Sequence, residues 1–366
     1  MKIAVVVPGG LDRSGEVKVV PALLALLERL AARHEVHVFA LRQEPRPAQW
    51  WLCGARVHNI GGRQGAVGVL RAVGAIGREH RRGAFDLVQA IWSGSVGLAA
   101  VLAARWLGLP CAVHVAGGEL VALADIGYGG RLTWRGRLRE AWVLRHADRR
   151  TAASAPVLAQ LASLGYAAER LPLGVDLRHW QPRPPRARQP GEPLRLVQMA
   201  SLNRVKDLGC LLRALACVPG VLLDVIGEDT LQGEMQALVA RLGLADRVCF
   251  HGFLTQPALR PVVARAHVCV VTSRHEAGPL AALEAAVLGL AVVGTAVGHL
   301  VEWAPEAARI VQPGDGVGLA ALIGQLAGDE PLRLRLAAAA QRRAVAQDAE
   351  FTHEQFARLH AELAGR

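Results

Sequence analysis

The fold is decided by HVCVVTSRHEAGPLAALEAAVLG, residues 267–289. This stretch opens with a hydrophobic, β-rich run, passes through a polar loop and ends in an apolar run typical of a buried helix. Gly278 suits the N-cap of that helix, Pro279 its first helical position and Gly289 its end. The stretch therefore predicts a strand, a loop and a helix in succession, which is the repeating unit of a parallel α/β sheet.

Two glutamates make this stretch a candidate binding site. Glu284 lies within the apolar run 280–290, where an unpaired carboxylate would cost several kcal/mol or take up a proton. We expect a polar ligand to keep it ionised, such as the two adjacent hydroxyls of a ribose, while Glu276 at the loop tip holds a sugar. The backbone N–H groups within residues 278–280, those of Gly278 and Leu280, would point at an anion, as at phosphate sites. The alternative is a surface loop with Glu276 solvated and Glu284 paired with an arginine.

The alternation of β-rich and helical patterns continues on both sides of a proline-rich segment. Residues 181–193 contain five prolines, which exclude helix interiors and central strands, so this segment is assigned as a linker. We expect Rossmann-like domains over 1–180 and 194–345, and a last helix over 346–366 for which packing back onto the first domain is one arrangement. The expected strands lie near 2–7, 35–40, 86–91, 111–115, 150–153, 194–200, 221–226, 247–250, 267–272 and 290–294, and the expected helices near 21–33, 208–216 and 330–363.

Composition narrows the classes of function. A chain of 366 residues, 52% of them hydrophobic, can fill two cores. The net charge is +11, but three of the 42 basic residues are lysines and the other 39 are arginines. We attribute this skew to codon bias more than to function and expect no nucleic-acid partner. The six cysteines form no C-x-x-C pair and the chain opens directly into a strand, so we expect a cytoplasmic protein with reduced thiols.

The residues around the two glutamates resemble a known family. Seven residues separate Glu276 from Glu284, as in the E-x7-E motif of retaining GT-B glycosyltransferases (group 1, family 4), and the segments 173–176, 246–253 and 289–298 match in order and spacing. The resemblance implies two facing Rossmann-like domains, the first binding the acceptor and the second the nucleotide-sugar donor. It implies that Glu284 binds the donor ribose and Glu276 the donor sugar. The other donor contacts that it implies are Gly278, Pro279 and Leu280 for the sugar and diphosphate, and Gly227 and Phe253 for the base.

Lys206 and Arg204 are the candidate cations for the donor diphosphate. Lys206 is the only lysine after position 18 in a chain that otherwise uses arginine, which favours a specific need for a compact ammonium. The family places a basic pair here, but its usual arginine position holds Ser201, so Arg204 would substitute from the other side. A solvated basic loop capping a helix is the alternative. The sequence has no Asp-x-Asp and no His/Cys cluster with metal-ligand spacing, so we expect no metal and no other cofactor.

The first domain contributes a glycine-rich loop after its first strand. Gly9, Gly10 and Gly15 lie in this loop, and the absence of side chains permits close backbone approach to a ligand. In the resembling family this loop lines the cleft near the diphosphate and the acceptor. A plain tight turn is the alternative.

A second candidate loop of the first domain follows the strand 111–115 and carries Gly118 and Glu119. Members of the family often have a histidine immediately before the glycine here, close to the transferred sugar, but this chain has Ala116 at that position. His114 lies two residues earlier, on the same face of the strand, and is the candidate catalytic substitute. A packed core histidine is the alternative.

A basic segment of the first domain, residues 131–150, contains seven arginines and two tryptophans. A basic amphipathic helix with aromatic residues can lie on an anionic membrane, here the inner face. An ordinary solvated helix face is the alternative.

Together these patterns predict a retaining, metal-independent glycosyltransferase. It would move a hexose-type sugar from a nucleoside diphosphate sugar to a polysaccharide, a lipid-linked acceptor or a small molecule. Two rivals on the same fold stay open. One is a non-catalytic scaffold that binds nucleotide or polysaccharide, favoured by Ala116; the other is a nucleotide-sugar epimerase or a phosphorylase-like enzyme.

Overall fold

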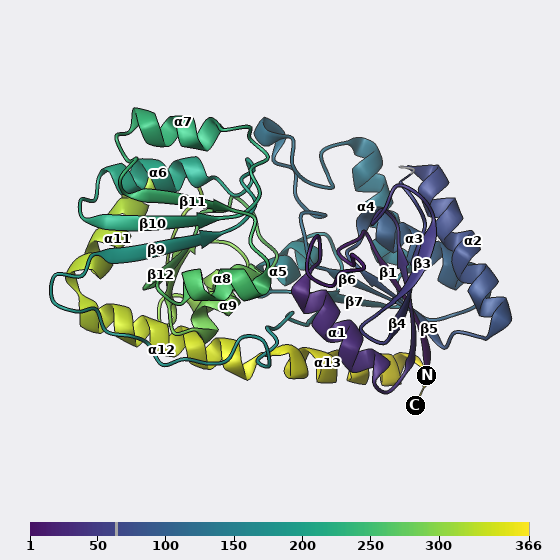
Figure 1. Ribbon diagram of the computed structural model, residues 1–366. Coiled ribbons are helices and arrows are strands. Elements are labelled where there is room, and N and C mark those ends of the chain that lie inside the picture. Colours follow the sequence, from purple (N-terminus) through teal and green to yellow (C-terminus); the bar gives the residue numbers. More distant parts are fainter. Residues whose placement is uncertain (63–64, 366) are drawn as a thin grey trace. The chain divides into compact units, whose positions relative to one another are not determined.

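The computed structural model describes residues 1–62 and 65–365 and divides into two compact units. The first unit comprises Met1–Leu173 and the segment that begins at Ala349, and the second comprises Gly174–Asp348. Arg366, the last residue of the expected final helix, lies outside the described residues. Each unit is built on its own largely parallel sheet flanked by helices, which confirms the predicted α/β class (Figure 1).

The sheet of the first unit has the strand order β3-β4-β2-β1-β5-β6-β7-β8. Neighbouring strands are parallel, except for β3 and β4, which form an antiparallel hairpin at one edge. The order reverses between β1 and β5, a switch point of the kind where open α/β sheets bind ligands. The strands are β1 (Lys2–Val7), β2 (Glu35–Ala40), β3 (Ala48–Leu52), β4 (Ala55–Asn59), β5 (Leu87–Ile91), β6 (Cys111–Val115), β7 (Arg149–Ala152) and β8 (Glu169–Arg170). The helices are α1 (Pro21–Ala31), α2 (Ala66–Arg82), α3 (Gly94–Leu107), the 3-10 turn η1 (Ala124–Ile126), α4 (Trp134–His146), α5 (Ala155–Ser163) and α13 (Ala349–Leu363).

The sheet of the second unit is parallel throughout, with the order β11-β10-β9-β12-β13-β14. Its switch point lies between β9 and β12. The strands are β9 (Leu194–Met199), β10 (Val221–Ile226), β11 (Val248–Gly252), β12 (Val268–Val271), β13 (Ala291–Thr295) and β14 (Ala308–Val311). The helices are α6 (Leu208–Ala216), α7 (Glu234–Arg241), α8 (Gln256–Val263), α9 (Leu280–Val287), α10 (His299–Trp303), α11 (Gly316–Gly328) and α12 (Glu330–Ala346).

Strand β12 explains why its sequence is apolar without interruption. Successive side chains of a strand point to opposite faces of the sheet, and both faces are covered. Val268 and Val270 join the core on one face, whereas Cys269 and Val271 join the core on the other. The chain leaves the sheet at the polar residues that follow, so the side chains of the predicted loop emerge at the carboxyl edge of this sheet.

The hairpin β3–β4 escapes prediction from the sequence for a local reason. Its two-residue turn consists of Cys53 and Gly54, with φ of 51° and 75°. Positive φ at both positions is typical of a tight hairpin turn, which usually shows itself as Asn-Gly or Asp-Gly. Cysteine at the first position gives no such signal, and the short strands on either side lack a clear alternation.

Helix α13 belongs to the first unit although the second unit precedes it in the sequence. It lies along α1 (Figure 1). The Thr352 hydroxyl donates to the Pro172 carbonyl at 2.9 Å, Arg29 Nε donates to Glu350 at 3.0 Å, and Phe356 is fully buried in the first unit's core. The segment that begins at Ala349 therefore packs into the core of the first unit.

Candidate functional site

A cavity of about 250 Å³ lies in the second unit at the carboxyl ends of β9 and β12. It sits at the switch point of that sheet, where ligands of doubly wound folds bind. Residues 267–289 supply one wall and the loop after β9 supplies another. The lining residues are Gln198, Met199, Ala200, Lys206, Val270, Val271, Ser273, Glu276, Gly278, Pro279, Leu280 and Ala281.

Helix α9 begins one residue later than the sequence predicts. Pro279 is its N-cap, with φ −69° and ψ 100°, and Leu280 is the first helical residue. The ring fixes only φ, and the extended ψ keeps Pro279 outside the helix. Gly289, with φ 79°, follows the helix as predicted. The first N–H groups of α9, at Leu280 and Ala281, have no carbonyl partner within the helix, and both residues line the cavity.

Lys206 and Glu276 meet in this cavity. Lys206 Nζ donates to Glu276 Oε1 at 2.5 Å, and the Ser273 hydroxyl donates to the same oxygen at 2.6 Å. The Glu276 side chain is 15% exposed, so it is not the freely solvated carboxylate of the surface-loop alternative. A cation and an anion thus lie side by side beside the start of α9, and each can turn to a ligand of opposite charge or to sugar hydroxyls.

Hydrogen bonds from a side chain and from the backbone hold the Lys206 loop against the end of β12. The Thr272 hydroxyl donates to the Lys206 carbonyl at 2.9 Å and accepts from Gln198 Nε2 at 3.0 Å. The Arg274 N–H donates to the Val205 carbonyl at 2.7 Å. Thr272 and Gln198 are buried, and their hydrogen bonds fix the position of the Lys206 backbone. The sequence patterns gave no signal for either residue, because the bonds join segments more than 60 residues apart.

Glu284 lies in α9, and no cation of residues 1–62 and 65–365 pairs with it; its hydrogen-bond donor is Gln256 Nε2, at 3.3 Å. Burial raises its pKa to about 8. The alternative of an internal arginine partner is therefore wrong for this structure. Desolvation favours the protonated carboxyl of Glu284 at neutral pH, and an ionised Glu284 held by a ribose stays a prediction.

Arg204 does not join Lys206 at the cavity. Its side chain is 61% exposed and Nη2 lies 3.3 Å from Glu234 Oε2, in α7. An exposed ion pair of this kind contributes little. Only one member of the expected basic pair therefore lines the cavity.

Gly227 and Phe253 lie where strands β10 and β11 end, at the same edge of the sheet as the cavity. A side chain at Gly227 is excluded, because a Cβ would lie 1.9 Å from the Ala200 carbonyl oxygen. Its N–H donates to the Gly252 carbonyl at 2.9 Å. Phe253 is 52% exposed. Neither residue lines the cavity itself, but both lie at the carboxyl edge of the second sheet, the edge at which open α/β sheets generally bind ligands.

In the first unit, the glycine loop after β1 is held from within by a side chain. Gln43 Oε1 accepts from the N–H groups of Gly10 and Leu11, at 2.7 and 2.9 Å. Gly10 has φ 84° and Gly15 φ 70°, which favour glycine. A Cβ on Gly9 would lie 3.2 Å from the same Gln43 oxygen. The loop is therefore a supported turn, and sequence reasoning missed Gln43 because it follows a different strand.

His114 is fully buried and packed. Its Nδ1 lies 2.9 Å from the Thr151 hydroxyl on β7, and its ring packs edge-on against Phe356 of α13. Burial lowers its pKa to about 3. The catalytic assignment of His114 is therefore corrected in favour of a packed core histidine. Strand β6 directs its side chain into the core, where it packs against Phe356 and is shielded from solvent.

Glu119 and Glu140 bracket the start of α3, at the carboxyl edge of the first sheet. Glu119 accepts from the backbone N–H groups of Ser93 and Gly117, at 3.1 and 2.7 Å, while the buried Glu140 accepts from the Ser93 hydroxyl at 2.6 Å. Burial raises the pKa of Glu119 to about 7. Glu119 thus ties two loops together. Gly118 lies against Tyr128, where a Cβ would be 2.5 Å from the ring.

Helix α4 carries the basic segment. Trp134 and Leu138 are 60% and 61% exposed and lie one turn apart, and Arg135 stacks near the Trp134 ring. The exposed apolar side chains and the arginines thus share one helix. Of the helices formed by residues 1–62 and 65–365, none is long and apolar enough for a membrane span.

Comparisons with known proteins agree on one family. The family described as glycosyl transferases group 1 matches residues 183–343, and the glycosyl transferase 4-like domain matches residues 19–174. The chain is 31% identical over 310 residues to the D-inositol 3-phosphate glycosyltransferase of Thermomonospora curvata, which covers 76% of this chain and 70% of that protein. It is 33% identical over 172 residues to the MMP alpha-(1->4)-mannosyltransferase of Mycolicibacterium hassiacum, covering 45% of this chain but 40% of that protein. The chain thus spans less than half the length of the second relative.

Solved structures share the fold. Sucrose-phosphate synthase from Thermosynechococcus elongatus superimposes with a TM-score of 0.86 at 21% identity, covering 99% of both chains. Anabaena Alr3699/HepE in complex with UDP and glucose gives a TM-score of 0.76 at 19% identity, covering 99% of this chain and 100% of that one. Two parallel α/β sheets in this arrangement along the sequence are the GT-B fold of such glycosyltransferases.

Proposed function

The chain belongs to the group 1 glycosyltransferases, and from that membership we propose that it moves a hexose-type sugar from a nucleoside diphosphate sugar to an acceptor with retention of anomeric configuration. The single observation that supports the donor site is the meeting of Lys206, Glu276 and the start of α9 in one cavity. An ammonium and unpaired helix N–H groups suit a diphosphate, and a neighbouring carboxylate suits sugar hydroxyls.

In this proposal the diphosphate binds Lys206 and the N–H groups of Leu280 and Ala281. Glu276 then exchanges its ammonium partner for hydroxyls of the transferred sugar. Glu284, whose burial favours a protonated carboxyl, would both donate to one ribose hydroxyl and accept from the other. The solved complex of Anabaena HepE with UDP and glucose supports the class of donor.

The proposed reaction breaks the bond between the sugar's anomeric carbon and the diphosphate oxygen. A bond to the acceptor oxygen forms on the same face, and the acceptor proton passes to the leaving diphosphate. Lys206 and the start of α9 stabilise the charge that develops on the leaving group, which is preorganised electrostatic catalysis. We assign no metal to this step. Neither a protein nucleophile nor His114, which is buried, is needed.

For the acceptor we propose a polysaccharide, a lipid-linked sugar or a small molecule. The exposed Trp134 and Leu138 beside the arginines of α4 support peripheral contact with an anionic membrane, at the cytoplasmic face. Aromatic and basic side chains together favour the interfacial region of a bilayer.

A donor panel tests the proposal. The melting temperature of the purified protein would be measured with UDP, GDP and ADP sugars. A ligand that binds only the folded state raises the free energy of unfolding by RT ln(1 + [L]/Kd), and the melting temperature rises with it. The best donor is then incubated with candidate acceptors and the product's anomeric configuration is read by NMR. A retained glycoside is expected. An inverted product contradicts the mechanism, nucleotide release without acceptor favours an epimerase, and binding without turnover favours a scaffold.

A further inference from the structure

Outside the donor site, three potential metal ligands converge in the first unit. His37 on β2, His58 on β4 and Glu79 on α2 are each buried, with 4%, 4% and 5% of their surface exposed. His37 Nδ1 lies 3.0 Å from His58 Nε2 and 3.9 Å from Glu79 Oε2, and the three ligand atoms all lie within 4.8 Å of one another. Two strands and a helix, β2, β4 and α2, thus bring three potential ligand atoms close together.

We propose that His37 Nδ1, His58 Nε2 and Glu79 Oε2 bind one divalent transition-metal ion, with Zn²⁺ as the ion to test. Two imidazoles and one carboxylate are a frequent zinc donor set that leaves a fourth position for water. Tetrahedral bonds of about 2.0–2.2 Å place ligand atoms about 3.3 Å apart. The observed separations bracket that value, so side-chain shifts of about an ångström suffice.

A carboxylate already orients the first imidazole. Glu35 Oε1 lies 3.0 Å from His37 Nε2, which favours the tautomer with its proton on Nε2 and its lone pair on Nδ1. The arrangement of carboxylate, histidine and metal is the usual outer shell of zinc sites. Without metal, the His58 Nε2–H would donate to the His37 lone pair. On binding, His58 moves its proton to Nδ1, so both imidazoles stay neutral and no net proton is released from them.

The charges around the cluster leave one carboxylate oxygen available. Arg82 Nη1 bonds Glu79 Oε1 at 2.6 Å, and Lys2 Nζ bonds Glu35 Oε1 at 2.9 Å. Glu79 Oε2 therefore remains directed at His37.

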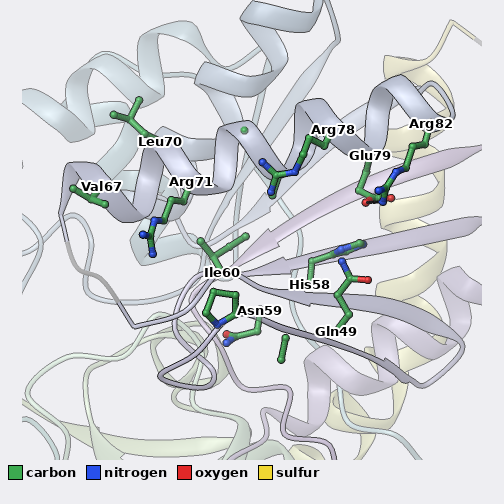
Figure 2. Close-up of a pocket in the computed structure, with 14 residues that line it drawn as sticks. Gln49, His58, Asn59, Ile60, Val67, Leu70, Arg71, Arg78, Glu79 and Arg82 are labelled. Carbon is green, nitrogen blue, oxygen red and sulfur yellow. Dashed lines mark hydrogen bonds and ion pairs between the residues drawn. The ribbon is translucent and has the colours of Figure 1, made fainter.

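A solvent-accessible pocket supplies the entry path and the fourth ligand. It has a volume of about 810 Å³, and His58 and Glu79 form part of its wall (Figure 2). Glu79 and Arg82 project from α2 toward the strand residues His58 and Gln49 (Figure 2). A bound ion would clamp α2 to β2 and β4. The site belongs to the first unit, so it is independent of the proposal that transfer at the donor cavity needs no metal.

A second cluster in the chain serves as a matched control. Asp224, Cys249 and His251 also converge in the second unit. Both carboxylate oxygens of Asp224 are engaged, one by His251 at 2.7 Å and the other by Arg195 at 3.1 Å. Cys249 is exposed. A cation would have to displace the arginine there, so we expect no tight binding at this cluster.

The test measures metal binding by the full chain after chelation and dialysis. Zn²⁺ is titrated by calorimetry, and Co²⁺ is added to report tetrahedral coordination by its visible absorption. One ion per chain is expected, with a rise in the melting temperature. His58→Gln and Glu79→Gln should weaken binding by more than about 100-fold, and Glu35→Gln, at a 60% exposed side chain, by about 10–100-fold. His251→Gln should bind like the parent.

Each outcome decides the proposal. No binding to the parent chain, or binding that survives His58→Gln and Glu79→Gln, overturns it. Loss of binding in His251→Gln assigns the ion to the other cluster and also overturns it. Should His58→Gln fail to fold, the Glu35→Gln variant carries the test, because its side chain is largely exposed; unchanged Zn²⁺ affinity in that variant then overturns the proposal.

Discussion

The two sheets place their polar residues differently at comparable positions. In the second unit, residues after β9 and β12 put Lys206 and Glu276 into a cavity. In the first unit, at the carboxyl ends of β5 and β6, Glu119 and Glu140 instead bind backbone N–H groups and a serine hydroxyl of their own loops. Polar groups in the second unit are available for exchange with a ligand, whereas those in the first unit are consumed in holding loops. We therefore assign the donor chemistry to the second unit and loop support to the first.

The largest expected effect comes from Lys206→Ala. Removing the ammonium should lower kcat by about 100- to 1,000-fold, because a preorganised charge that meets the leaving group is lost. Arg204→Ala is the matched control: its exposed pair with Glu234 lies off the cavity, so kcat should change by less than about threefold. Steady-state kinetics on the best donor measure both. Equal losses in the two variants would move the donor site away from this cavity.

Glu284→Gln should alter the dependence of stability on pH. Burial raises the folded pKa of Glu284 to about 8 from an ordinary value of 4.5, so the folded state binds the proton more tightly. The resulting stability is full below pH 4.5 and is lost as the pH rises through 8. Between pH 5 and 8.5 the free energy of unfolding should therefore fall more in the parent than in Glu284→Gln, by a few kcal/mol at most. Melting temperatures measured over this range report the difference. Parallel curves would show that this carboxyl is solvated.

His114→Val should destabilise the fold and spare the chemistry. The change leaves the Thr151 hydroxyl without its partner, at a cost of about 1–3 kcal/mol. The matched variant Thr151→Val breaks the same hydrogen bond from the other side and should lower the melting temperature similarly. Turnover per folded molecule should stay within about threefold in both. A 100-fold loss of kcat in His114→Val alone would restore its catalytic assignment.

The smallest expected effect concerns α4. Trp134→Ser should weaken sedimentation with anionic vesicles severalfold, since its exposed ring adds apolar area beside the arginines. Exposed Trp106, on α3 of the same unit, supplies the control Trp106→Ser, which should bind vesicles like the parent. Identical behaviour of both variants would leave α4 an ordinary solvated helix.

The sequence predicts well what is encoded locally. Three local patterns carried the prediction: the alternation of apolar runs, the glycine after α9 and the seven-residue spacing of the two glutamates. Each can be recognised from residues close together in the sequence, and together they indicated the two sheets and the wall of the cavity. The predicted start of α9 was one residue too early, because Gly278 and Pro279 both suit a helix N-terminus.

What the sequence could not predict depends on contacts between distant segments. Gln43 fills the glycine loop, Thr272 anchors Lys206, and His114 meets Phe356 across the core. No spacing rule joins these residues. The same holds for His37 and His58, which lie 21 residues apart and meet only because β2 and β4 pair.

A crystal structure with UDP, or with the nucleotide that the donor panel selects, tests the central claim most directly. We predict that Lys206 Nζ contacts the diphosphate, that Glu276 has released Lys206, and that the Glu284 carboxyl bonds both ribose hydroxyls. A nucleotide bound away from the start of α9, with the Lys206–Glu276 pair intact, would contradict the donor site described above.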